Sequence, residues 1–409
     1  KPMKKNIIAG QSGGPTAVIN ASLYGVIEEG LSRAGEVGTI YGMINGIEGF
    51  LSGHFMDLSA SLSPEDRELL KHTPGAYLGS CRHKLPQNMD SPVYPLLFEK
   101  LASMDIGALF YIGGNDSMDT VEKLSRYGEL CHSSISFIGV PKTIDNDLPV
   151  TDHTPGYGSA AKYVASTVRE IVLDASVYQQ PSITLVELMG RHAGWVTAAS
   201  VLARKFPEDN PRLIYLPESP FSVEQLFADV ERALAQTPSL VICVSEGIKD
   251  SSGRFICEYA SEAQTDTFGH KMLTGCAKIL EGYLKNRFGV KVRSVELNVN
   301  QRCSGLISSL CDIEEAAEAG RFAVKSALEG ASGQMVTLTR QPGPDYHMVP
   351  GLTDAAAVCN KEKTFPSEWI TPDGCGVRPE FISYALPLIQ GEPPRAAENG
   401  LPRYLYRHI

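Results

Sequence analysis

The chain has 409 residues, 43% apolar and 21% charged, which is ordinary for a folded protein and too long for one compact core. Its formal charge of -10 argues against general nucleic-acid binding, because phosphate backbones need a basic surface. No apolar run approaches the roughly 20 residues that span a bilayer, so we expect a cytoplasmic protein without membrane association. Nine cysteines without a Cys-x-x-Cys pair argue against a disulfide framework or a zinc site and favour free thiols.

A strand, a glycine-rich loop and a helix are predicted at the start of the chain. The strand covers residues 6–9, the loop residues 10–15, and the helix residues 17–34, where apolar residues recur at helical spacing. Such a loop can bind a phosphate, although a single unit of this kind also fits an ordinary turn. Residues 39–42 are predicted to form the next strand, and Ser63 is expected to cap a short helix.

Two further loops follow apolar runs that are predicted to be strands. Residues 106–112 lead into Gly113-Gly114-Asn115-Asp116-Ser117, and residues 135–140 lead into Pro141-Lys142-Thr143-Ile144-Asp145-Asn146-Asp147. The Gly-Gly turn before a helix leaves room for a phosphate, whereas the second loop adds one ammonium and two carboxylates. Each motif alone also fits a tight turn or a polar loop. In an open parallel sheet, however, such loops meet at one crevice, where ligands bind.

A second series of strands and helices is predicted beyond residue 150. The two series favour an α/β fold of two Rossmann-like three-layer domains with mainly parallel sheets and an active site in the cleft between them. We assign residues 1–150 and about 303–345 to the first domain, and residues 151–302 and about 346–409 to the second. The part beyond about residue 341 is interpreted as an interface element or a lid. The predicted elements of this series are strands at 182–188, 212–216, 240–244, 291–299 and 335–340 and helices at 160–175, 266–287, 313–329 and, less regularly, 354–359.

Three stretches occur in a characteristic order, namely Gly113-Gly114-Asn115-Asp116-Ser117, the run from Pro141 to Asp147, and Met189-Gly190-Arg191. They resemble the signature stretches of the phosphofructokinase family, specifically of its pyrophosphate-dependent branch. The likeness extends from the loop at Gln11 to about Gly305. It implies two domains with a donor site on the first and a sugar-phosphate site on the second.

The resemblance implies a reaction and a role for each motif residue. The reaction is transfer of a phosphoryl group from pyrophosphate to the 1-hydroxyl of fructose 6-phosphate, with Mg²⁺ as cofactor. Asp145 would be the general base, and Thr143 would hydrogen-bond the sugar or the bridging phosphate. Pyrophosphate would be bound by Gly13, Gly14, Arg82, Lys84 and Gly114, the metal by Asn115, Asp116 and Asp147, and the sugar phosphate by Thr143, Asp145, Asp147, Met189, Gly190, Arg191, Glu246, Arg293 and Arg302. In the family an arginine for the 6-phosphate is often lent by a neighbouring subunit, which implies a homo-oligomer, either a dimer or a tetramer.

Two positions bear on the phosphoryl donor. The ATP-using relatives usually carry glycine at both, whereas this chain has Asp116 and Lys142, the pair typical of pyrophosphate users. A carboxylate at Asp116 would lie where the α-phosphate of a nucleotide must go, and it would repel that phosphate. Lys142 would then supply positive charge for the transferring phosphoryl group and the leaving phosphate. We therefore count both residues with the catalytic set.

The chain departs from the family pattern at three positions. Asn115 stands where the family usually carries a metal-binding aspartate, Ser182 where many relatives have an arginine, and Val299 where many have a histidine. Sugar binding would then depend more on Arg191, Arg293 and Arg302, with Lys271 or Lys278 as further cations, and a seven-carbon sugar phosphate stays open. The alternatives are an ATP-dependent sugar-phosphate kinase and a non-catalytic regulatory subunit, with a kinase of the NAD kinase type as a distant fourth.

Overall fold

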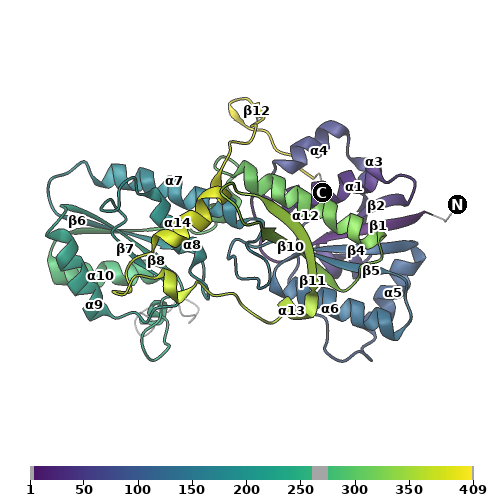
Figure 1. Cartoon of the computed structure of the whole chain (residues 1–409), viewed down its shortest axis with the longest axis horizontal. Coiled ribbons are helices and arrows are strands. Elements are labelled where there is room, and N and C mark those ends of the chain that lie inside the picture. Colours follow the sequence, from purple (N-terminus) through teal and green to yellow (C-terminus); the bar gives the residue numbers. More distant parts are fainter. Residues whose placement is uncertain (1–3, 260–274, 408–409) are drawn as a thin grey trace, which may run out of the picture.

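Two separate sheets organise the chain, and the computed structural model describes residues 4–259 and 275–407 of it (Figure 1). One sheet has seven strands in the order β11-β10-β5-β4-β1-β2-β3, and the other has four in the order β7-β8-β6-β9. The chain crosses to the second sheet after β5 and returns to the first through α12 (Leu310–Leu328). This arrangement confirms the predicted α/β class of two layered domains with mainly parallel sheets.

The central strands of the larger sheet are buried on both faces. They are β1 (Lys5–Gln11), β4 (Ile106–Gly113) and β5 (Ser136–Pro141), which pair in parallel. Alternate side chains of such strands point to opposite faces. Ile7 accordingly packs in the core with α1 (Ile19–Ser32) and α12, whereas Ile8 packs in the core with α5 (Val93–Ser103) and α6 (Asn115–Leu130). Sheet and helices therefore form three layers.

Helices α1 and α12 pack against each other at unusually short range. A Cβ on Gly25 would lie 1.9 Å from the carbonyl oxygen of Ala317, and one on Gly320 would lie 2.1 Å from that of Ser22. Only glycine fits at these two positions without moving the helices apart. The returning segment that begins with α12 is in this way fixed against the first helix of the chain.

The smaller sheet repeats this design with four parallel strands, β6 (Ser182–Leu188), β7 (Leu213–Tyr215), β8 (Ser239–Ser245) and β9 (Lys291–Glu296). One face packs on α7 (Tyr157–Ala175) and α14 (Pro379–Ala385). The other face packs on α9 (Val223–Leu234) and α10 (Cys276–Phe288). The remaining short elements are β2 (Val37–Met43), β3 (Phe55–Asp57), β10 (Gln334–Arg340), β11 (Met348–Asp354), β12 (Ala397–Glu398), β13 (Leu401–Pro402), α2 (Gly46–Leu51), α3 (Leu58–Ser61), α4 (Pro64–Lys71), α8 (Trp195–Ala198), α11 (Asn300–Cys303) and α13 (Ala355–Val358).

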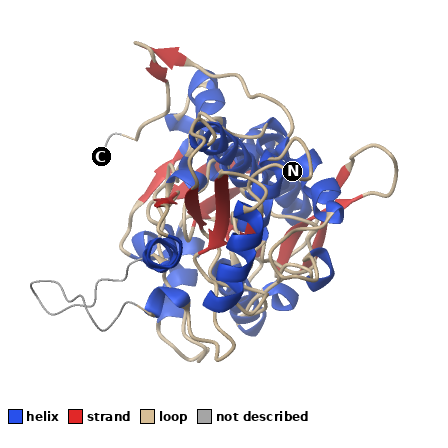
Figure 2. Ribbon diagram, turned by 90° about the vertical axis from the view of Figure 1, so that its left-hand side faces the viewer, coloured by secondary structure: helices blue, strands red, loops and turns tan. Residues whose placement is uncertain are grey.

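The part of the chain after about residue 346 differs most from the sequence prediction. We placed residues from about 346 onward with the second domain, but β11 pairs antiparallel with β10 in the seven-stranded sheet along its whole length. The change of sheet therefore comes after β11, and buried residues between 365 and 388, including those of α14, pack in the core of the smaller sheet. The hairpin of β12 and β13 belongs to neither sheet and projects near the end of the chain (Figure 2).

Local predictions can be compared with the observed elements one by one. Ser63 caps α4, because its side chain accepts a hydrogen bond from the Asp66 N–H while the Asp66 carboxylate accepts one from the Ser63 N–H. The strand predicted at 291–299 ends at Glu296. Of the helix predicted at 266–287, the part before residue 275 lies outside the described residues. All nine cysteines are free thiols, and no helix among the described residues is both long and apolar enough to cross a membrane.

Candidate active site

A cavity of about 650 Å³ lies at the carboxyl ends of β1, β4 and β5. These three strands are neighbours in the sheet, so the loops that follow them meet at one edge. All five residues predicted to bind pyrophosphate line it, together with the catalytic and metal candidates of the two central loops. The lining consists of Ser12, Gly13, Gly14, Cys81, Arg82, His83, Lys84, Gly114, Asn115, Asp116, Ser117, Lys142, Thr143, Asp145, Asp147, Asn360 and Glu362.

Lys142 lies at the base of this cavity with only 3% of its surface exposed. Its Nζ donates a hydrogen bond to the carbonyl oxygen of Gly14 over 2.5 Å, and a Cβ on Gly13 would lie 3.4 Å from the same nitrogen. Gly13 has a φ of 77°, a backbone conformation that favours glycine. Burial lowers the pKa of Lys142 to about 8, against the attraction of the Asp145 carboxylate. A cation therefore lies directly under the first phosphate loop.

The loop from Thr143 to Asp147 is held in an unusual backbone conformation. Asn146 is fully buried with a φ of 53°, and its Oδ1 accepts a hydrogen bond from the Thr154 N–H at 3.0 Å. Its Nδ2 donates to the hydroxyl of Tyr384 in α14 at 2.8 Å. Because Asn146 is fixed from both sides, the carboxylates before and after it, Asp145 and Asp147, are directed into the cavity that they line.

Burial changes the proton affinity of both carboxylates. It raises the pKa of Asp145, and the Glu246 carboxylate raises it further, while the Lys142 ammonium lowers it. Burial and the charge of Asp145 together raise the pKa of Asp147 to about 7. A carboxylate with a raised pKa accepts a proton more readily, which suits a general base near neutral pH.

The predicted cations at the cavity are Lys84, Arg82 and Arg302. Lys84 Nζ lies 3.1 Å from Asp116 Oδ1, and both side chains are largely exposed. Arg302 was predicted for the sugar phosphate, but its Nη1 lies 3.1 Å from the position that a Cβ on Gly14 would occupy. Arg302 and Arg82 are also near enough to Lys142 to lower its pKa. Arg302 therefore approaches the first phosphate loop, where the missing side chain of Gly14 makes room for it.

Four of the predicted sugar-phosphate residues, Met189, Gly190, Arg191 and Glu246, lie at the carboxyl ends of β6 and β8. Glu246 Oε1 accepts a hydrogen bond from the Gly190 N–H at 3.0 Å, and Gln301 Oε1 accepts one from the Met189 N–H at 3.2 Å. The Arg191 guanidinium lies over the ring of Phe255, 5.5 Å from its centroid. These residues border the catalytic loop, since the charge of Glu246 acts on Asp145.

Arg293 was also predicted to bind the sugar phosphate, but its side chain lies beside an acidic residue at the surface. It lies on β9, and its Nη1 is 3.5 Å from Asp174 Oδ2 of α7, with both side chains well exposed. Lys278, the further cation that we considered, pairs with Glu281 of its own helix. Lys271 lies outside the described residues.

The cavity differs from the sequence prediction in two respects, the contacts of Asn115 and the presence of Asn360 and Glu362. The Asn115 side chain forms hydrogen bonds with Val358, the last residue of α13, and with Asn360 and Lys361 just after that helix. Asn360 and Glu362 of that segment line the cavity and were not predicted. No motif could have indicated them, because they come after the part of the chain that resembles the family. Among the described residues, no group of three or more histidine, cysteine, aspartate or glutamate side chains could by itself hold a metal ion.

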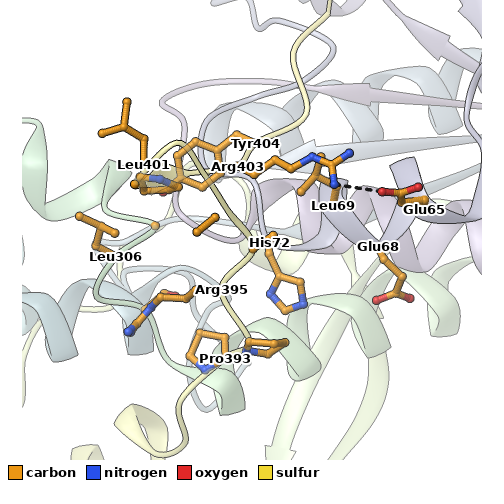
Figure 3. A pocket seen from close by; sticks show the side chains of 17 residues that line it. Glu65, Glu68, Leu69, His72, Leu306, Pro393, Arg395, Leu401, Arg403 and Tyr404 are labelled. Carbon is orange, nitrogen blue, oxygen red and sulfur yellow. Dashed lines mark hydrogen bonds and ion pairs between the residues drawn. The ribbon is translucent and has the colours of Figure 1, made fainter.

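A second cavity, of about 450 Å³, lies between α4, the segment 305–308 and the segment 393–404 near the end of the chain (Figure 3). Its walls are mainly apolar, and its charged groups have partners in the protein. Arg403 Nη1 lies 3.0 Å from Glu65 Oε1, and Glu68 accepts a hydrogen bond from Tyr24. None of the predicted site residues lines this second cavity.

Known proteins are similar to this chain in sequence and in fold. The phosphofructokinase family matches residues 6–296. This chain belongs to the phosphofructokinase family. A pyrophosphate–fructose 6-phosphate 1-phosphotransferase of Halomonas elongata is 39% identical over 401 residues, which cover 97% of this chain and 95% of that protein. A sulfofructose kinase of Alkalicoccus urumqiensis is 33% identical over 83% of this chain and 85% of its own length.

A solved structure of the same family also superimposes on this chain. The pyrophosphate-dependent phosphofructokinase of Nitrosospira multiformis has a TM-score of 0.89 and 36% identity, and the alignment covers 98% of this chain and 96% of that one. The family that the sequence motifs indicated is thereby confirmed.

Proposed function

We propose that this phosphofructokinase transfers a phosphoryl group reversibly from pyrophosphate to the 1-hydroxyl of fructose 6-phosphate, giving fructose 1,6-bisphosphate and phosphate. The observation that carries the proposal is the position of Lys142, buried against the Gly14 carbonyl in the cavity that Asp116 and Asp145 also line. The relative from Halomonas elongata is named for this activity. We expect the enzyme to act in the cytoplasm.

Asp145 is the proposed general base. Its carboxylate would accept the proton of the sugar hydroxyl while that oxygen attacks phosphorus, a contribution typically worth about 10² to 10⁴ in rate. Its burial and raised pKa support this role. Thr143 accepts a hydrogen bond from the Asp145 N–H at 3.1 Å, so it orients the base from one side. The sugar would lie between this loop and the groups at Gly190 and Glu246.

The donor would bind against the loops at Gly13 and Gly114. Backbone N–H groups and the nearby cations Lys142 and Arg82 can stabilise the phosphate charges that shift during transfer. Asp116 excludes the α-phosphate of a nucleotide by charge and bulk, and Lys84 keeps that carboxylate paired at the cavity rim. These features favour pyrophosphate over ATP.

The cavity suits a magnesium ion that is shared with the substrate. Mg²⁺ commonly takes one or two carboxylates, keeps several waters and bonds substrate phosphates, so it needs no cage of protein ligands. Carboxylates line the cavity at Asp116, Asp145, Asp147 and Glu362. We propose Asp116 and Asp147 as the protein ligands, and the metal would neutralise phosphate charge during transfer.

We further propose that the seven-stranded sheet carries the donor and the four-stranded sheet carries the sugar phosphate. Arg293 lies on the outer part of the second sheet and faces Asp174, away from the donor cavity of its own chain. An arginine fork at this surface is suited to a phosphate bound by a neighbouring copy. A homo-oligomer in which copies exchange such arginines follows from this proposal.

The test is the initial rate of fructose 1,6-bisphosphate formation with Mg²⁺, measured with pyrophosphate and with ATP at the same concentration. We expect turnover with pyrophosphate and none above background with ATP. The Asp145→Ala variant serves as the control for contaminating activity. Equal rates with the two donors would overturn the donor assignment, and no rate with either would favour a regulatory subunit.

A further inference from the structure

Asn115 stands at the position for which a metal ligand was predicted, yet one segment of the protein uses its whole carboxamide group. Its Nδ2 donates hydrogen bonds to the carbonyl oxygens of Lys361 at 2.5 Å and Val358 at 3.2 Å. Its Oδ1 accepts a hydrogen bond from the Asn360 N–H at 2.6 Å. The partners lie more than 240 residues further along the chain, between 243 and 246 positions away.

The chemistry of these bonds requires an amide. A carboxylate accepts hydrogen bonds but donates none at neutral pH. An aspartate at position 115 could still accept the Asn360 N–H, but its other oxygen would face the carbonyl oxygens of Val358 and Lys361. Two bonds would thus be replaced by contacts between negatively polarised atoms. The change from aspartate to asparagine at this position therefore fits the segment and not the metal.

The same segment, residues 358–363, forms further hydrogen bonds with other parts of the chain. Asn360 adopts a φ of 59°, and its Nδ2 donates to Asp119 Oδ1 of α6 at 3.2 Å. The Lys363 N–H donates to the carbonyl oxygen of Asp147 at 2.7 Å, and the Trp195 Nε1–H donates to that of Lys363 at 3.1 Å. The segment therefore joins the first turns of α6, the catalytic loop and the second domain.

Helix α6 also contacts a second segment that lines the cavity. Asp119 is paired with Lys123 at 2.6 Å, and both side chains are buried. Lys123 Nζ donates to the carbonyl oxygen of Leu85 at 2.8 Å, next to the cavity residues Arg82 and Lys84. One helix thus contacts both the segment 82–85 and the segment 358–363, and residues of both segments line the donor cavity.

We propose that Asn115 is a positioning residue that latches the segment 358–363 onto the pyrophosphate cavity, and that it is not a magnesium ligand. Asn360 and Glu362 of the latched segment then complete the wall of the donor site. The inference rests on the proposed function for the identity of the donor. The geometry of the latch itself is a property of the free protein.

The Asn115→Asp variant separates the two roles because they predict opposite results. If Asn115 were a metal ligand, the added charge would lower the Mg²⁺ concentration needed for half-maximal rate. For a latch, we expect the KM for pyrophosphate to rise about tenfold or more, the Mg²⁺ requirement to stay the same or increase, and kcat to change less. A lower Mg²⁺ requirement with an unchanged KM would overturn the proposal.

A second measurement needs no turnover. The chain has two tryptophans, and Trp195 is bonded to Lys363, so tryptophan fluorescence of the free protein reports the position of the segment. We expect Asn115→Asp to shift the emission spectrum without any ligand, and an unchanged spectrum would contradict the latch. If the wild-type protein failed to use pyrophosphate, the proposed function would fall, while this spectral result would still decide the latch.

Two further variants complete the design. Asn360→Gly tolerates the left-handed backbone but loses the bond to Asp119, so it should shift KM and fluorescence in the same direction by a smaller amount. It also keeps the test decisive if Asn115→Asp fails to fold. Asn399→Asp adds the same charge in the turn between β12 and β13 and should change neither quantity. An effect of this control equal to that of Asn115→Asp would refute the latch.

Discussion

The donor side and the sugar side of the active site are built differently. On the proposed donor side, loops after three adjacent strands meet in one cavity, where backbone groups and the buried Lys142 would supply the binding atoms. On the proposed sugar side, the Gly190 N–H donates a hydrogen bond to the Glu246 carboxylate. The Arg191 side chain lies over the ring of Phe255, and the Arg293 side chain lies beside Asp174. Backbone loops at adjacent strand ends can therefore form a site within one chain. The positions of long arginine side chains depend instead on the groups that they contact.

Burial is the second difference. Lys142 is buried and Asp145 is half-buried, and the environment shifts the pKa of each. Arg293 is well exposed, where ion pairs contribute little because water and salt screen them. The donor side should therefore respond to single substitutions by losing catalysis, and the sugar side by losing affinity.

The largest expected effect is on the donor side, at Asp145. Asp145→Asn keeps the shape of the side chain but removes the proton acceptor, so kcat should fall by about 10² to 10⁴. The KM for fructose 6-phosphate should change little. The measurement is steady-state kinetics with both substrates varied. A variant with near-normal kcat would show that another group accepts the proton.

The next effect concerns donor choice. Replacing Asp116 and Lys142 together by glycine removes the buried cation and the excluding carboxylate, so kcat/KM for pyrophosphate should fall about 10² to 10³-fold. Some turnover with ATP should appear. Both donors are assayed under identical Mg²⁺, with the single variants as controls. No gain with ATP would mean that other residues, such as those of the segment 358–363, close the nucleotide space.

Substitution of the arginines tests the sugar side directly. Arg302→Ala should raise the KM values for pyrophosphate and for fructose 6-phosphate about tenfold, because Arg302 lies beside Gly14 and the catalytic loop. Arg293→Ala should raise only the KM for fructose 6-phosphate. Mixed oligomers of Arg293→Ala and Asp145→Asn chains would recover activity if copies exchange Arg293. Without recovery, Arg293 would act within its own chain or not at all.

A smaller effect is expected in the pH profile of catalysis. Asp147 has a pKa of about 7 and Lys142 one of about 8, so kcat/KM should rise as the carboxylates ionise and decline as Lys142 loses its proton. Lys142→Arg should move the decline to higher pH, because arginine stays charged. Dividing the variant profile by that of the wild type cancels the titration of pyrophosphate itself. An unchanged decline would assign it to another group.

The last prediction concerns stability at the junction of the two domains. Burial alone lowers the pKa of His153, but the carboxylates of Glu315 and Asp152 outweigh this and raise it to about 9. This pKa lies above the unfolded value of 6.5. The interaction of protonated His153 with the two carboxylates therefore stabilises the fold fully below about pH 6.5, and this stabilisation is lost as the pH rises through 9. The contribution is about 3 kcal/mol.

The His153→Gln variant tests this contribution. Its urea unfolding midpoint should differ most from that of the wild type at pH 6 and least above pH 9. Comparing the two proteins at each pH cancels the titration of Lys142 and Lys363, whose pKa values burial lowers to about 8. A difference that does not change with pH would show that folding leaves the pKa of His153 unchanged.

The sequence was sufficient to predict the donor side. Strands with near-continuous apolar residues, such as 106–112, are expected to be buried on both faces, and they end in loops whose glycines and charged residues can bind a phosphate and a metal. The parallel order of these strands then places Gly13, Gly114 and Asp145 at one edge. Local pattern and strand topology together determine such a site.

Only the tertiary structure decided the rest. The return of β11 to the first sheet, the approach of Arg302 to Gly14 and the bonds from Asn115 to the segment 358–361 all join parts that lie far apart in the sequence. No local pattern encodes such contacts, because they depend on how α12 packs on α1 and on the path that the chain takes after α12. The sequence shows an asparagine at position 115, and its hydrogen-bond partners in the folded chain show why an amide is needed there.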